Sequence, residues 1–77
     1  MVNELNADIL VIGLGQEYWK KVYNWGREQK LFTPMEDDLI RLVSTFEQTG
    51  KIPSSKQATI ILQTREKLID EGMPKEF

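Results

Sequence analysis

The 77-residue sequence contains no cysteine and no histidine. Without cysteine the chain can form neither a disulfide nor a thiolate metal site, and without histidine it lacks the commonest metal ligand and general base. Its adjacent carboxylates, Asp37 with Asp38 and Asp70 with Glu71, would point about 100° apart on a helix and so do not converge on one site. We therefore expect no metal, no cofactor and no enzymatic activity.

Long hydrophobic runs are also absent. The most apolar stretch, residues 9–14, is far shorter than the roughly 20 residues that a membrane-spanning helix needs. The first residues carry Glu4 and Asp8 where a signal peptide would carry basic side chains. We predict a cytoplasmic protein that has no contact with membranes. Its formal net charge of −2 provides no attraction to phosphate backbones, which weakens the case for nucleic-acid binding.

Signals for both ends of one α-helix occur in the stretch TPMEDDLIRLVSTFEQTG. Thr33 suits the N-cap, Pro34 suits the first helical position, and Glu36 can reach back to the Thr33 amide to complete a capping box. Gly50 can adopt the left-handed conformation that ends a helix. The spacing predicts one continuous helix over residues 34–49. Its expected apolar stripe consists of Met35, Leu39, Leu42, Val43 and Phe46.

The helix predicted over residues 16–30 is rich in aromatic side chains. Trp19, Val22, Tyr23 and Gly26 share one face, where the glycine would let a partner helix approach closely. We interpret this face chiefly as part of the core. In the alternative, some aromatic side chains stay exposed as anchors for a partner protein. The candidate partner surface comprises Tyr18, Trp25, Phe32 and Ile60.

A second capping box opens the last predicted helix, because Gln57 follows Ser54 at the required spacing. The apolar face of this helix consists of Ala58, Ile61, Leu62, Leu68 and Ile69. Arg65 interrupts that face. We expect Arg65 to lie at the edge of the core or to pair with Glu47 or Asp38.

Residues 7–14 are ambiguous between a short helix and a buried strand. Their β-branched cluster suits a strand, whereas Leu5, Ile9 and Ile12 lie at helical spacing. We favour the helix, because the chain offers no second strand candidate to pair with a lone strand. The Gly-Leu-Gly that follows matches part of a dinucleotide-binding fingerprint. Tyr18 occupies the third glycine position of that fingerprint, and we interpret the glycines as a hinge between two helices.

These signals predict an all-α fold, a small three- to four-helix bundle formed by a single domain over residues 1–77. Residues 1–4 and 74–77 are expected to fray. The predicted helices cover residues 5–13, 16–30, 34–49 and 55–71.

The turn before the last helix suggests nucleic-acid binding. In a helix-turn-helix protein, the second helix presents its first residues to base edges. The helix that starts at Ser55 carries suitable side chains there, although the acidic net charge and a long connector argue against DNA binding. The candidate nucleic-acid contacts are Lys51, Ser55, Lys56, Gln57 and Thr59.

Three motifs occur in order along the chain: Trp19-x-x-Val22-x-x-Trp25-Gly26, Thr33-Pro34-x-Glu36 and Gly50-Lys51-Ile52-Pro53-Ser54-x-x-Gln57. In this order they resemble a small helical module near the C-terminus of the abortive-infection phage-resistance (AIPR) proteins. The resemblance implies a non-catalytic accessory segment of a bacterial or phage-related protein, with any enzymatic activity housed elsewhere.

We therefore expect a non-catalytic protein–protein interaction or accessory module of a prokaryotic or phage-related protein. A separate protein or a parent chain is the expected partner, and self-association is an alternative. Nucleic-acid binding through the helix at Ser55 ranks second. An acidic inhibitor that mimics nucleic acid ranks third.

Overall fold

The computed structural model describes residues 6–77, and this part of the chain is helical without any strand. The helices are α1 (Ala7–Leu14), α2 (Gln16–Glu28), α3 (Pro34–Val43), α4 (Phe46–Thr49) and α5 (Ser55–Asp70). The all-α prediction is confirmed, and α1 decides in favour of helix over strand for its segment. The predicted fraying of residues 1–4 and the start of the first helix at residue 5 lie outside the described residues.

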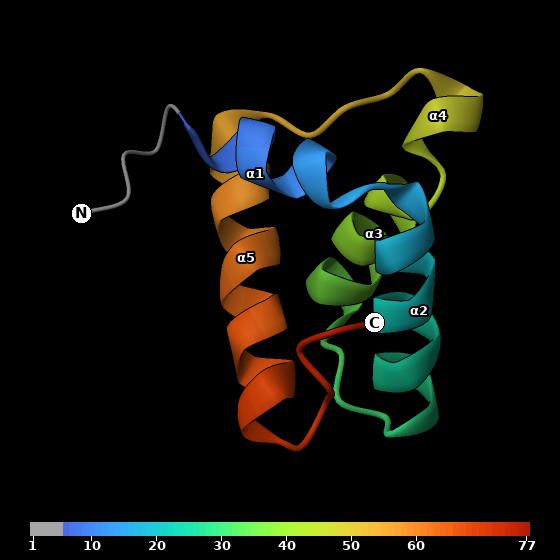
Figure 1. The fold of residues 1–77 in the computed structure, drawn as a ribbon, viewed down its shortest axis with the longest axis vertical. Coiled ribbons are helices and arrows are strands. Elements are labelled where there is room, and N and C mark those ends of the chain that lie inside the picture. Colours follow the sequence, from blue (N-terminus) through green and yellow to red (C-terminus); the bar gives the residue numbers. More distant parts are fainter. Residues whose placement is uncertain (1–5) are drawn as a thin grey trace.

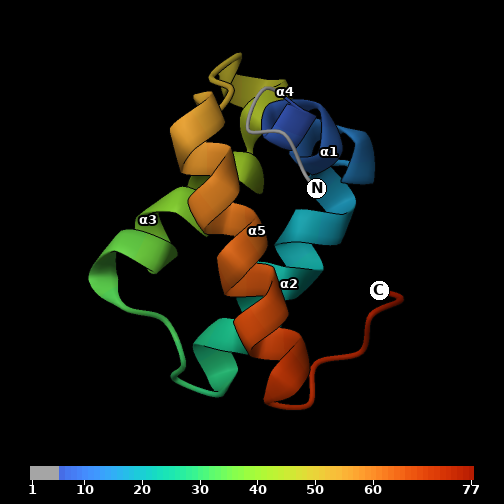
Figure 2. The ribbon, with the colours of Figure 1, turned by 90° about the vertical axis from the view of Figure 1, so that its left-hand side faces the viewer.

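The three longest helices, α2, α3 and α5, pack together, and α1 lies across one end of them (Figure 1). The helices α2 and α5 run in the same direction, whereas α3 runs the opposite way at a tilt and packs against both. In Figure 2, α5 lies in front, with α3 to one side and α1 and α2 to the other. Because α1 packs across α5 and the start of α2, it closes the upper end of the body in Figure 1.

The centre of the core is built by all four of the longer helices. Trp19 is the largest fully buried side chain, and its indole N–H donates to the backbone carbonyl of Val11 at 2.7 Å. This bond gives the buried N–H a partner and ties α2 to α1. The largest fully buried side chains are Val11 from α1, Trp19 and Val22 from α2, Ile40 and Val43 from α3, and Ile61 and Leu68 from α5.

Both predicted capping boxes form. The amide of Thr33 donates to Glu36 Oε1 at 2.9 Å, and the amide of Glu36 donates back to Thr33 Oγ1 at 3.3 Å. Ser54 and Gln57 exchange the equivalent bonds at 2.9 and 3.1 Å at the start of α5. These bonds satisfy amides that the first turn of a helix leaves without intrahelical partners.

The prediction of one continuous helix over residues 34–49 is wrong. The helix stops at Val43 and resumes as the single turn α4. The Ser44 hydroxyl donates to the Arg41 carbonyl at 2.7 Å, and the Thr45 hydroxyl donates to the same oxygen at 3.2 Å. Side-chain hydroxyls compete in this way with the backbone amides that would continue the helix. At the restart, the buried side-chain carbonyl of Gln16 accepts the amide of Glu47 at 2.9 Å.

The predicted apolar stripe of this segment includes one residue that is not buried and omits one that is. Met35 is 59% exposed, whereas Ile40, which lay outside the stripe, is fully buried. The half-buried Glu36 takes the inward position in the first turn, because Lys67 on α5 donates to its carboxylate at 2.5 Å. The resulting face of α3 buries Leu39, Ile40 and Val43.

Two glycines shape the connections of α2. Gly15 has φ +89° and joins α1 to α2, which confirms the predicted hinge. The expectation that Gly26 admits a partner helix is wrong, because the ring of Phe32 occupies the space that a Cβ at Gly26 would need. That ring also stacks on Tyr23, with ring centroids 5.9 Å apart.

The C-terminal segment returns from the end of α5 toward the body (Figure 1). Met73 is buried and Phe77 packs against the core cluster. The fraying predicted for residues 74–77 concerns their motion and stays a prediction.

Candidate functional site

The outer face of α1 carries an unusual amount of exposed apolar surface for so short a helix. Ile9 is 67% exposed, Leu10 48% and Leu14 39%, and Asp8 is the one charged residue of the helix. A helix that is apolar on most of its sides cannot bury every side chain against a neighbour that covers only one of them. The remainder faces outward and forms a ridge, which we define as Ile9, Leu10 and Leu14.

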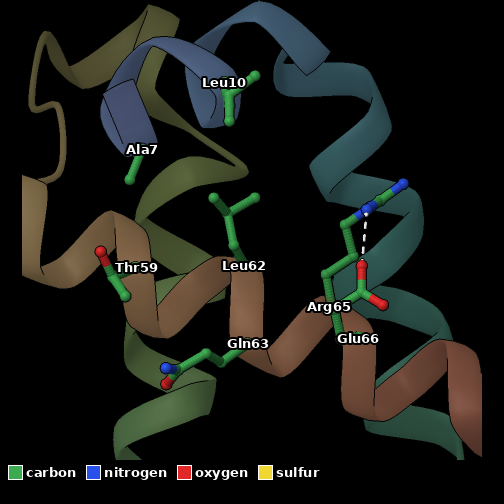
Figure 3. A pocket seen from close by; sticks show the side chains of 7 residues that line it. All are labelled: Ala7, Leu10, Thr59, Leu62, Gln63, Arg65 and Glu66. Atoms are coloured by element: carbon green, nitrogen blue, oxygen red, sulfur yellow. Dashed lines mark hydrogen bonds and ion pairs between the residues drawn. The ribbon is translucent and has the colours of Figure 1, made fainter. Parts of the chain in front are cut away.

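A groove runs between this ridge and α5, as two adjoining hollows of about 380 and 360 Å³. Leu10, Leu62 and Arg65 line both hollows and so make the groove continuous. Figure 3 shows Leu10 of α1 facing Leu62 of α5, with Arg65 and Glu66 together at one end. The other lining residues are Ala7, Thr59, Gln63 and Glu66 in the first hollow and Ile9, Gly13 and Leu14 in the second. We call this feature the α1–α5 groove.

Arg65 supplies the polar end of the groove. Its Nε donates to the hydroxyl of Tyr18 at 2.6 Å, its guanidinium lies 5.7 Å from the centre of the Tyr18 ring, and Nη1 lies 3.4 Å from Glu66 Oε1. Arg65 is partly buried and pairs with an acidic residue, as predicted, but that residue is Glu66 and not Asp38 or Glu47. Asp38 instead pairs with Arg41 at 2.8 Å within α3. Tyr18 and Glu66 therefore hold Arg65 in place, and its charge is balanced locally.

The residues predicted as a partner surface do not gather into one exposed patch. Tyr18, Trp25, Phe32 and Ile60 are each half-buried and pack against the core cluster. Of the four, Tyr18 reaches the edge of the α1–α5 groove, through its bond to Arg65. The ridge was not predicted, because the helical spacing of Leu5, Ile9 and Ile12 indicates a helix but not which of its sides another element covers. The available signal was the near absence of charge in an eight-residue helix.

The candidate nucleic-acid contacts lie around the start of α5. Lys51 and Lys56 are exposed, whereas Ser55, Gln57 and Thr59 are half-buried. The Gln57 carbonyl accepts the Ser54 amide, and the Thr59 hydroxyl donates to the Ser55 carbonyl at 3.0 Å. Two of the five candidates thus use their polar atoms on the backbone of α5. In addition, α4 lies between α3 and α5, so the connection is longer than a tight helix-turn-helix turn.

A polar cluster on another face joins the start of α3 to α5. Lys67 donates to Glu36 and to the carbonyl of Leu31, the latter at 2.9 Å, and the Thr64 hydroxyl lies 3.4 Å from Glu36 Oε2. Partial burial acts to raise the pKa of Glu36, but the hydrogen bond from Lys67, the bonds of the Thr33 cap and the charge of Lys67 together hold that pKa below its ordinary value. We interpret the cluster as structural, because each of its polar groups is used within the fold.

Among residues 6–77, no three acidic side chains lie together in a way that could hold a metal ion. Within the same part of the chain, none of the helices combines the length and the apolar character needed to cross a membrane.

No model of a known protein family matches the chain, and comparisons with curated proteins and with solved structures likewise give no match. The resemblance to AIPR proteins therefore stays a prediction. The function proposed below therefore rests mainly on the geometry of the α1–α5 groove.

Proposed function

We propose that the protein is a non-catalytic helical module that binds a protein partner through the α1–α5 groove and the ridge beside it. In this proposal it serves as an accessory part of a prokaryotic or phage-related system. The observation that carries the proposal is the exposure of Ile9, Leu10 and Leu14 on one side of a groove whose other side is lined by Leu62. Contiguous apolar surface with a polar edge is typical of partner-binding sites.

The lining of the groove favours a protein over a small polar substrate. Its walls are mainly aliphatic, and its charged groups, Arg65 and Glu66, already contact each other. Apolar grooves of this kind take the apolar face of a helix, whose side chains insert at regular spacing. The chain also has no cysteine or histidine for nucleophilic or acid–base chemistry.

Photo-crosslinking in cells tests this proposal. A photoreactive amino acid replaces Ile9, and the matched control places the same amino acid at Ile52, which is 60% exposed but lies outside the groove. We expect protein adducts from position 9 that are absent from position 52. An absence of protein adducts at position 9, or equal adducts at both positions, would count against the proposal.

DNA binding through the start of α5 is the second candidate function. It is supported by the two exposed lysines, Lys51 and Lys56, on either side of the Ser54 cap. Phosphate contacts strengthen as salt is lowered, so a titration with duplex DNA at low salt gives this function its best chance. Binding that weakens with salt and with Lys51→Ala and Lys56→Ala would support it, and no binding at low salt would rule it out.

A further inference from the structure

We propose that the partner seated on the α1–α5 groove is a second copy of this chain, related to the first by a two-fold axis. This inference rests on the proposed function, because it names the partner of the same surface. In a two-fold interface the same patch occurs on both subunits and must be complementary to itself. Such a patch needs both a protruding part and a recess that can receive it.

The surface around α1 carries both parts side by side. Ile9 and Leu14 protrude on the ridge, with 67% and 39% of their surface exposed, and the recess lies between Leu10 and Leu62 (Figure 3). A two-fold axis that passes close to Leu10 would place the ridge of each copy in the recess of the other. Gly13 lies within this surface and has open space at its Cβ position, so the backbone of α1 can be approached closely there.

The charges at the groove are also complementary to themselves. One end carries a single positive and a single negative side chain, Arg65 and Glu66, with their charged atoms 3.4 Å apart. Glu66 is 67% exposed at its side chain, so it is accessible to an arginine from a second copy. Under two-fold symmetry, Arg65 of each copy can face the other copy's Glu66, and both contacts are attractive.

This balance of charge favours a second copy over a strongly charged partner. A strongly basic or strongly acidic partner would be attracted by one of these two charges and repelled by the other. The apolar lining of the groove would not offset that repulsion. The chain as a whole carries a net charge of −2, so two copies would repel weakly over most orientations. When two copies meet through the α1–α5 groove, the charges of Arg65 and Glu66 at the contact attract each other and this repulsion does not act there.

Sedimentation equilibrium of the full chain tests the inference, over concentrations from about 1 μM to about 1 mM so that a weak pair can be detected. The wild type should form dimers in this range. Ile9→Asp should weaken the dimer by at least about tenfold, because the symmetry places the new charge in the apolar contact twice. Ile52→Asp removes a similarly exposed isoleucine outside the groove and should leave the dimer unchanged.

Gly13→Gln provides a second test that leaves the apolar side chains in place. It adds bulk at a position where nothing lies within 4 Å of the new Cβ, and should abolish dimers without disturbing the helical circular dichroism spectrum. A wild type that is monomeric throughout the range would overturn the inference, whichever other protein or segment covers the groove. So would dimers that survive both Ile9→Asp and Gly13→Gln.

The proposed function and this inference fail in different ways. A monomeric chain that crosslinks to other proteins from position 9 keeps the proposed function and overturns the second copy as partner. A monomeric chain without protein crosslinks from position 9 overturns both. Crosslinks between two copies of the chain from position 9, together with dimers that Ile9→Asp dissociates, support both.

Discussion

The two consecutive helices α1 and α2 use their apolar residues in opposite ways. Charged side chains surround the aromatic face of α2, and its Trp19 and Val22 are fully buried. In contrast, α1 has a single charge, buries Ala7 and Val11, and leaves Ile9, Leu10 and Leu14 exposed to solvent over 39–67% of their surface. The more hydrophobic helix is therefore the less completely buried one. Burial follows the separation of polar and apolar sides, not the total apolar content.

This contrast separates residues that build the fold from residues that are available for binding. The inner side of α1 belongs to the fold, because the Val11 carbonyl accepts the indole N–H of Trp19. The side chains of the ridge, on the outer side, are aliphatic and between 39% and 67% exposed. Substitutions on the two helices should therefore have very different effects on stability.

The largest effect is expected at Trp19. Replacing it with alanine should lower the free energy of unfolding by about 3–5 kcal/mol, because a large buried side chain is lost and a cavity remains. Trp19→Phe should cost less, roughly 1–3 kcal/mol, by leaving the Val11 carbonyl without its partner. Urea unfolding followed by far-ultraviolet circular dichroism gives both values. A loss below about 1 kcal/mol for Trp19→Ala would contradict the placement of this side chain at the centre of the core.

The glycines of the two helices provide a matched pair. Gly26→Ala in α2 should lower stability by about 1–3 kcal/mol, since its methyl group meets the ring of Phe32. Gly13→Ala in α1 meets no neighbouring atom and should raise stability by up to about 1 kcal/mol through better helix propensity. The same urea unfolding experiment measures both changes.

The Phe32 contact can be isolated by a double-mutant cycle. Phe32→Leu removes part of the ring that blocks Gly26, so Gly26→Ala should cost less in its presence than in the wild type. Equal costs in the two backgrounds would show that the ring does not limit Gly26.

A smaller effect is expected at the Glu36 cluster, which joins α3 to α5 away from the ridge. The pKa of Glu36 lies below its ordinary value of about 4.5, so its contribution to stability is fully present above that pH and is lost as the pH falls through the folded value. Glu36→Gln keeps an oxygen for the Thr33 amide but loses the charge that faces Lys67. It should lower stability by about 1 kcal/mol near pH 7 and reduce the acid dependence below pH about 4.5.

The other capping box supplies the control for this experiment. Gln57→Glu introduces a carboxylate at the matching position of α5, near the positive end of the helix dipole, and should not lower stability at pH 7. Unfolding curves at several pH values distinguish the two variants. An unchanged acid dependence in Glu36→Gln would show that other carboxylates account for it.

The parts of the fold that depend on neighbouring residues were predictable from the sequence. Both capping boxes and the Gly15 hinge follow from residue types at fixed local spacing, and all three occur in the structure. The break between α3 and α4 was not predictable in this way. It involves Gln16, which is 31 residues away from the Glu47 amide that it caps, and no local pattern reveals that contact.

The candidate site was harder to predict than the fold. Helical spacing indicates which residues share a face, but it does not indicate how much of that face another element covers. Tyr18, Trp25, Phe32 and Ile60 had the residue types of a partner surface, yet packing against the core leaves them half-buried. The exposure of Ile9 depends on α1 crossing the end of the body, which is a property of the tertiary arrangement (Figure 1).

The most direct test of the contrast between the two helices is the free energy of unfolding of Ile9→Asp and wild type, measured at increasing protein concentrations. If the ridge serves binding and not folding, the free energies of unfolding of the two proteins should agree within about 0.5 kcal/mol at low concentration. An aspartate at position 9, in the first turn of α1, also suits the helix dipole. As concentration rises, association should stabilise the wild type alone. A loss of about 2 kcal/mol or more in Ile9→Asp at every concentration would contradict the account, because the ridge would then belong to the folding core.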